Sequence, residues 1–219
     1  MRHLIWDWNG TLVDDLAVVV DAVNVTLEEL GAAPISASDY RDNYTRPVRV
    51  FYERILGRSV SDPDWRFLDD RFHAAYRERL DTAGLSAGAA DALHRVAAEG
   101  ATQSVLSMWW HEELVPEVAR LGVAPHMLLV EGNTTRAGEP KANLLAAHLG
   151  ALEQRHGIAA PETVMIGDTL DDAMACTANA VACVLVDSGS HHRSELAASG
   201  YPVAADVRAA AALALAALG

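Results

Sequence analysis

The chain has 219 residues, of which 51% are hydrophobic and 21% are charged, the balance of an ordinary globular domain or of one domain with a smaller insert. Its 17 basic and 30 acidic residues give a net charge of −13, so the overall field repels a nucleic-acid backbone. Apolar runs are shorter than the roughly 20 residues that span a membrane, and we expect neither nucleic-acid nor membrane partners.

Short apolar runs rich in β-branched residues alternate along the chain with helical patterns. Strands are predicted over residues 3–7, 102–107, 127–131, 163–167 and 181–186. Helices are predicted over residues 87–99, 141–152 and 208–218. Strands that alternate with helices indicate βαβ units and a parallel sheet covered on both faces, so the predicted fold is an α/β, Rossmann-like core.

Residues 15–80 interrupt this alternation with helical spacing alone. Apolar side chains recur at intervals of three and four in three stripes, with a loop, GAAPISASD, after the first stripe. The stripes contain Leu16, Val20, Val23, Leu27 and Leu30; Val48, Phe51, Ile55 and Leu56; and Trp65, Leu68, Phe72, Tyr76 and Leu80. We therefore predict a helical domain at 15–80, inserted into a core domain formed by 1–14 and 81–219.

Four polar residues end the predicted strands or follow them: Asp7, Ser107, Lys141 and Asp168. Ligands of doubly wound sheets bind at the carboxyl ends of the strands, so these side chains are expected around one crevice. Each alone has a structural explanation, as a turn residue, a helix cap or a solvated lysine in the first turn of a helix. All four lie at the end of a predicted strand or after it, and this common position favours a shared site.

The chemistry of these residues favours phosphoryl transfer. Asp7 and Asp168 offer the hard oxygen ligands that suit a Mg²⁺ ion bound to phosphate. Ser107 and the backbone amides after it, beginning with Met108, can hold phosphoryl oxygens. Lys141, the only lysine in the chain, supplies a compact positive charge beside Asp7, whose carboxylate is also available as a covalent nucleophile.

Four segments resemble, in order and spacing, the four motifs of the haloacid dehalogenase (HAD) superfamily. They are DWNGT (7–11), SVLS ending at Ser107, Lys141, and GDTLDD (167–172). The likeness spans residues 3 to 187 and is greatest to phosphoglycolate-phosphatase-like members, which hydrolyse small phosphate monoesters. The inserted helices resemble the C1-type cap domain of that family.

The resemblance implies a role for each matching position. Asp7 would be phosphorylated as the nucleophile, with Lys141 beside it in the catalytic group. The implied metal ligands are Asp7, Asp168, Asp172 and the backbone carbonyl of Asn9. The implied phosphate ligands are Ser107, Met108 and Lys141.

Position 9 departs from the family pattern, which has an aspartate there as general acid and base. The amide of Asn9 neither gives nor takes a proton near neutral pH, and such help is typically worth about 10²–10⁴-fold in rate. One explanation is a leaving group that needs no acid, such as an acyl or aryl phosphate. Others are a substitute group such as His111, a slow reaction with a long-lived phospho-aspartate, or deamidation of the Asn9–Gly10 pair.

Substrate selection is expected to rest with the helical insert. Arg46 and Arg49 stand near aromatic residues and are candidates for holding a carboxylate or a second phosphate, while arginines there also balance the acids of the insert. His111 follows the second motif, where a capping or exposed histidine is the structural alternative. Trp109 and Trp110 are candidates for a wall of the site, with one of them packed under the sheet.

The sequence thus predicts a cytoplasmic, Mg²⁺-dependent phosphatase of a small phosphorylated substrate, acting as a monomer or homodimer. The chain has only two cysteines, and its N-terminus becomes polar too early for a signal peptide. Both features favour the cytoplasm. An alternative is a catalytically weakened member that binds a phosphorylated ligand or partner in a regulatory role. A haloacid dehalogenase is a more distant third. The substrate is not identified by the sequence.

Overall fold

A six-stranded parallel sheet forms the centre of the computed structural model, which describes residues 1–135 and 139–219. Its strands are β1 (His3–Trp6), β4 (Thr102–Trp110), β5 (Leu129–Asn133), β6 (Thr163–Gly167), β7 (Ala182–Val186) and β8 (Val203–Ala204). They lie in the order β5–β4–β1–β6–β7–β8, and all neighbours pair in parallel. The predicted α/β, Rossmann-like core is confirmed.

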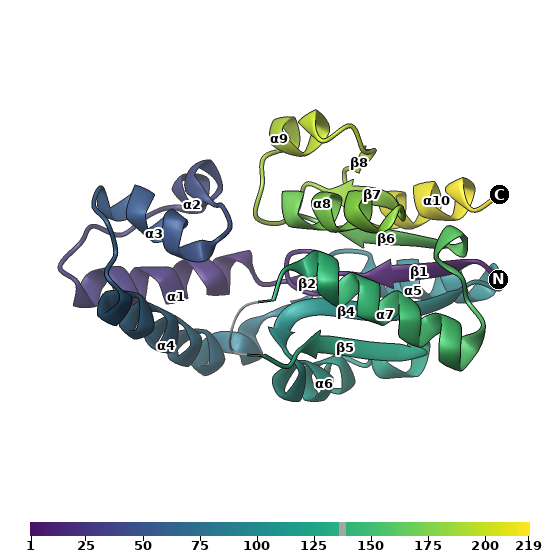
Figure 1. Cartoon of the computed structure of the whole chain (residues 1–219). Coiled ribbons are helices and arrows are strands. Elements are labelled where there is room, and N and C mark those ends of the chain that lie inside the picture. The colour runs from purple at the N-terminus through teal and green to yellow at the C-terminus, as the bar shows by residue number, and fades with distance from the viewer. Residues whose placement is uncertain (136–138) are drawn as a thin grey trace.

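Helices cover both faces of this sheet (Figure 1). They are α5 (Ala89–Ala98), α6 (His111–Arg120), α7 (Lys141–His156), α8 (Leu170–Asn179), α9 (Arg193–Ala198) and α10 (Val207–Ala217). Side chains of β1 alternate between two apolar clusters, because successive residues of a strand point to opposite faces. Leu4 and Trp6 pack with α5, α6 and α10, whereas Ile5 packs with α7, α8 and α9. Within the described residues, no helix has the length and apolar character that crossing a membrane requires.

Several core elements end at residues other than the predicted ones. Strand β4 runs on to Trp110, past the expected end at Ser107, with a register shift against β5 between Leu106 and Trp110. Helix α7 continues to His156, where Gly157 ends it in the left-handed conformation. These two differences arise at a bulged strand and at a glycine cap, which apolar periodicity alone does not reveal.

Four helices between β1 and the rest of the sheet form what we call the helical insert: α1 (Leu16–Glu29), α2 (Ala37–Asn43), α3 (Val48–Leu56) and α4 (Asp62–Arg79). Val23, Leu27 and Leu68 belong to an apolar cluster of the insert itself. The chain enters and leaves the insert through the antiparallel pair β2 (Val13–Asp14) and β3 (Gly84–Leu85). In Figure 1 the insert lies beyond the end of the sheet to which the strand arrows point, away from both termini.

Helix α2 begins inside the segment that was predicted as a loop, GAAPISASD. A capping box explains its start, because Ser36 and Asp39 satisfy each other's backbone amides. The Asp39 amide donates to Ser36 Oγ at 3.2 Å, and the Ser36 amide donates to Asp39 Oδ2 at 2.8 Å. The loop prediction was therefore wrong for residues 37–39.

A buried chain of hydrogen bonds at the amino-terminal part of the sheet involves His3. Its ring nitrogens lie 2.8 Å from Thr102 Oγ1 and 2.8 Å from Ser104 Oγ. Ser104 Oγ in turn lies 2.7 Å from His148 Nε2, and His148 Nδ1 lies 2.8 Å from Glu131 Oε2. Burial, with a smaller contribution from His148, lowers the pKa of His3 to about 3.

This depressed pKa predicts an acid-sensitive contribution of His3 to stability. Between about pH 6.5 and about pH 3 the unfolded chain protonates His3 and the folded chain does not, so the contribution of His3 to stability falls as the pH falls, by up to ~1.4 kcal/mol per unit. Urea unfolding at about pH 7 and about pH 5.5 measures this slope. The His3→Gln variant should show a shallower slope than wild type, and an unchanged slope would contradict the assignment.

Candidate active site

Three buried carboxylates meet at the carboxyl ends of β1 and β6. Asp7 directly follows β1, Asp168 directly follows β6, and Asp172 lies in the first turn of α8. Their exposed fractions are 5%, 1% and 0%, and one oxygen of each lies within 4.8 Å of the others. The amide of Asp7 donates to the carbonyl of Ile166 at 2.8 Å, which joins the two strand ends. The parallel sheet thus brings Asp7 to two acids that lie far along the chain from it.

The backbone around Asp168 is shaped to fit its carboxylate. Gly10 has a φ of +71°, and a Cβ there would lie 2.6 Å from Asp168 Oδ2. The amide of Ser190 donates to Asp168 Oδ2 at 2.8 Å, and Thr11 Oγ1 donates to Asp168 Oδ1 at 3.3 Å. Glycine in the turn DWNGT therefore serves two needs, a left-handed backbone and a close approach to a carboxylate.

Lys141 supplies the positive charge among these acids. It opens α7 and is only 3% exposed, with Nζ donating to Asp7 Oδ1 at 2.6 Å and also contacting the carboxylate of Asp172. Burial alone would lower the pKa of Lys141, but the carboxylates of Asp172 and Asp7 outweigh it and raise the pKa above its ordinary value. Lys141 therefore stays charged and partly offsets the crowded carboxylates.

One ammonium leaves this cluster short of positive charge. Burial raises the pKa of Asp7 to about 6, with Asp172 adding to the effect and Lys141 opposing it. Burial also raises the pKa of Asp168 well above its ordinary value, and the nearby charges of Asp7 and Asp172 add to that shift. A hard divalent cation with oxygen ligands matches this donor set, and its charge would favour the ionised carboxylates. The residues present thus fit the predicted Mg²⁺ ion.

Ser107 and Met108 lie within β4 rather than at its end. Ser107 Oγ accepts from the amide of Trp109 at 3.1 Å and lies 3.4 Å from Asn9 Oδ1. It does not cap α6, whose N-terminal flanking residue is Trp110. Ser107 therefore faces the DWNGT turn, and Met108 lines the cavity described below.

Both hydrogens of the Asn9 side-chain amide are engaged within the protein. Its Nδ2 donates to Asp15 Oδ2 at 2.7 Å and to the hydroxyl of Tyr76 at 2.8 Å, while its Oδ1 faces Ser107. Because a carboxamide nitrogen carries two hydrogens, both are used within the protein. The side chain has only its oxygen left to offer to a ligand.

Asp15 and Tyr76 are parts of the site that the sequence reasoning missed. Asp15 is 2% exposed and accepts from Asn9, from the amide of Gly10 at 2.9 Å and from the Tyr76 hydroxyl at 2.7 Å. Burial raises the pKa of Asp15, and the hydrogen bonds from Asn9 and Tyr76 oppose that shift. A signal existed for Asp15, since it directly precedes an apolar helical stripe. None existed for Tyr76, which comes from α4.

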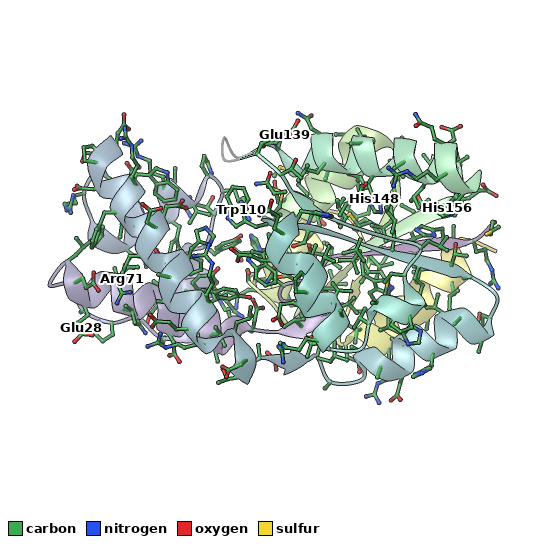
Figure 2. All side chains as sticks on the ribbon, turned by 90° about the horizontal axis from the view of Figure 1, so that it is seen from below. Glu28, Arg71, Trp110, Glu139, His148 and His156 are labelled. Carbon is green, nitrogen blue, oxygen red and sulfur yellow. The ribbon has the colours of Figure 1, made fainter. Side chains whose placement is uncertain are left out.

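A cavity of about 720 Å³ lies between the helical insert and the core and extends to Asn9. Trp109 and Trp110 both line it, as does Arg46, whose Nε lies 3.7 Å from Asp171 Oδ2. Figure 2 shows Trp110 on the side of the core that faces the insert. The predicted wall residues and one of the two predicted arginines thus border one space.

Arg49 and His111 lie outside the lining of this cavity. The Arg49 guanidinium donates to the carbonyl of Val60 at 2.9 Å and to Asp62 Oδ1 at 2.7 Å, so it joins two parts of the insert. His111 Nδ1 accepts from the amide of Gly132 at 3.2 Å and so ties the start of α6 to β5. Neither side chain therefore borders the space that Arg46, Trp109 and Trp110 share.

The structure combines a doubly wound α/β core, a cluster of three buried carboxylates at the carboxyl ends of its strands, and a helical insert. The family model of haloacid dehalogenase-like hydrolases matches residues 4–186, and the chain belongs to that family.

Named relatives agree with this assignment. A phosphoglycolate phosphatase of Agrobacterium fabrum is 26% identical over 190 residues, covering 84% of this chain and 80% of that protein. A phosphoglycolate phosphatase of Chromobacterium violaceum is 25% identical over 203 residues, covering 90% of each. A solved haloacid dehalogenase-like family hydrolase from Streptococcus pneumoniae superposes with a TM-score of 0.81 at 17% identity, covering 94% of this chain and 95% of that one. The chain is thus phosphoglycolate-phosphatase-like in sequence, and the solved structure shares its fold.

Proposed function

We propose that this protein is a Mg²⁺-dependent phosphatase that transfers the phosphoryl group of a small phosphate ester to Asp7 and then releases it to water. The observation that carries the proposal is the meeting of Asp7, Asp168 and Asp172, all buried, with one lysine. A substrate phosphate adds negative charge to a site already short of positive charge. Such a site suits a reaction that a metal ion and placed donors make possible.

Each residue of the cluster has a proposed role in this reaction. Asp7 is the nucleophile, and Lys141 holds its carboxylate and the incoming phosphate. Asp7, Asp168, Asp172 and the backbone carbonyl of Asn9 are the proposed ligands of Mg²⁺. When bound, that ion neutralises charge on the phosphoryl oxygens. Ser107 and the amide of Met108 complete the phosphate site.

The curated relatives support a phosphate ester as substrate, because those named above are phosphoglycolate phosphatases. We propose residues 1–14 and 81–219 as the core domain and 15–80 as a cap that covers the substrate, with the β2–β3 pair as the connection between them. The cavity between insert and core supports this division. Two free, buried cysteines suit a reducing cytoplasm as the site of action.

The test is phosphate release from acetyl phosphate, phenyl phosphate and 2-phosphoglycolate by the purified protein, with Mg²⁺ and with excess chelator. We expect turnover with Mg²⁺ and its loss, by about 10²-fold or more, when the chelator removes the ion. Adding Mg²⁺ back should restore the rate. Equal turnover without any divalent ion, or no turnover of any of these three phosphates, would contradict the proposal.

A further inference from the structure

Aromatic side chains dominate the cavity that adjoins Asn9. Those that line it are Tyr40, Tyr44, Phe51, Tyr52, Trp65, Phe72, Tyr76, Trp109 and Trp110. Tyr44, Trp65 and Phe72 of the insert and Trp110 of the core are only partly buried, so they present ring surface to the space. Met108 and Met174 add polarisable sulfur to the same lining. Such walls favour a flat apolar group, which gains from stacked and edge-on contacts.

The charges along the cavity oppose a small anionic group next to the phosphate. Arg46 is the only arginine or lysine among the described lining residues, and it already lies 3.7 Å from the carboxylate of Asp171. Acids at Asp15, Asp69 and Glu139 also line the space. At about 720 Å³ the cavity is also far larger than a two-carbon acid needs. A neutral, ring-sized group fits these walls better than a carboxylate.

The leaving group must also depart without help from an acid beside Asp7. Both hydrogens of the Asn9 amide are held by Asp15 and Tyr76, and both oxygens of Asp15 accept hydrogen bonds from the protein. The Tyr76 hydroxyl donates its hydrogen to Asp15. A phenol, with a pKa of about 10 like that of tyrosine, leaves as its anion far more readily than an alkoxide, whose parent alcohol ionises near the ~15.7 of water.

We infer that the substrate is an aryl phosphate, a monoester in which an aromatic ring carries the phosphate oxygen; this rests on the function proposed above. The carboxylate of Asp7 forms a bond to phosphorus while the bond from phosphorus to the aryl oxygen breaks, and the phenolate leaves with the electron pair. Water then attacks the acyl phosphate, restoring the Asp7 carboxylate, and its proton leaves with the phosphate. The ring occupies the aromatic cavity that Trp110 of the core and Trp65 of the insert both line.

Four phosphates separate the two parts of this inference. Phenyl phosphate has a ring and a good leaving group, and benzyl phosphate has a ring and an alkoxide leaving group. Acetyl phosphate has a good leaving group without a ring, and 2-phosphoglycolate has neither. We expect kcat for benzyl phosphate to be about 10²-fold or more below that for phenyl phosphate, because no acid assists it. We expect KM for acetyl phosphate to be about tenfold or more above that for phenyl phosphate, because it makes no ring contacts.

Variants of the wall test where the ring binds. Trp110→Leu, and separately Trp65→Leu in case the first disturbs β4, should raise KM for phenyl phosphate about three- to tenfold relative to acetyl phosphate. Phe67→Ala is the matched control, because this exposed aromatic of α4 lies outside the cavity lining. Normal selectivity in both tryptophan variants would overturn the inference.

The substrate series also distinguishes this inference from the proposed function. If acetyl phosphate or 2-phosphoglycolate is turned over in a Mg²⁺-dependent reaction at least as efficiently as phenyl phosphate, the aryl specificity is wrong and the phosphatase stands. If none of the four phosphates is turned over with Mg²⁺, the proposed phosphatase function itself is wrong. Preference for phenyl phosphate in both kcat and KM supports the two together.

Discussion

Replacing Asp7 with Asn is expected to lower Mg²⁺-dependent phosphate release by about 10⁴-fold or more, because the carboxylate that accepts the phosphoryl group is gone. The substitution keeps the shape of the side chain, and an amide oxygen can still accept from Lys141. It also removes one of three crowded, buried negative charges. The metal-free variant should therefore unfold at a urea concentration equal to or above that of wild type.

Measuring the initial rate and the urea midpoint together separates an effect on the reaction from an effect on folding. Initial rates with phenyl phosphate and urea midpoints are measured on the same preparations of Asp7→Asn and wild type. Asp70→Asn serves as the control, since Asp70 is an exposed acid of α4 distant in sequence from the motifs. Retention of more than a few per cent of wild-type turnover in Asp7→Asn would remove Asp7 from the reaction. A large loss of stability in Asp7→Asn would contradict the expected relief of charge repulsion, and capture of the phosphorylated protein would then test the chemistry.

The second large effect concerns Asn9 and its partner Asp15. Asn9→Asp places a second carboxylate against Asp15 Oδ2, which the amide now contacts at 2.7 Å. Like charges so close cannot both stay ionised without cost, so we expect the single variant to lose about 1–3 kcal/mol of unfolding free energy. Its rate with benzyl phosphate should stay low or rise only a little.

The double variant Asn9→Asp/Asp15→Asn exchanges the acid and the amide and keeps one of each. We expect it to regain most of the lost stability and to hydrolyse benzyl phosphate about 10²-fold faster than wild type, because position 9 now carries a titratable group. Asp15→Asn alone is the matched control. Additive stability changes in the double variant, with no coupling between the two positions, would contradict the pairing.

Much of the core and of the carboxylate cluster could be predicted from the sequence, for a physical reason. In a parallel sheet the carboxyl ends of all strands meet at one edge, so a residue's place after a strand also gives its place in the site. Asp7 and Asp168 follow strands that are short, apolar and β-branched, which single-sequence patterns reveal well. The order of segments then sufficed to place Lys141 near them.

The lining of the cavity and the hydrogen-bond partners of Asn9 could be predicted less well, because they depend on packing between helices that are distant in the sequence. Tyr76 reaches Asn9 from α4, and its period-of-three-and-four spacing indicated only an apolar face. Arg46 and Arg49 both lie near aromatic residues in the sequence, so the sequence did not distinguish them. In the structure Arg49 donates to the carbonyl of Val60 and to the carboxylate of Asp62 at the start of α4. The partner that each side chain binds depends on local geometry, which the spacing of apolar residues in the sequence does not reveal. The long β4 was missed for the same reason, since its register shift arises against β5.

The most direct test that Asp7 is the nucleophile is capture of the phosphorylated protein. Wild type is mixed with Mg²⁺ and phenyl phosphate, quenched in acid during turnover and digested, and the peptides are weighed by mass spectrometry. We expect one added phosphoryl group on the peptide that contains Asp7, and none on that peptide from Asp7→Asn. Phosphate release by wild type with no phosphoryl group on that peptide, or with the group on another residue, would contradict it.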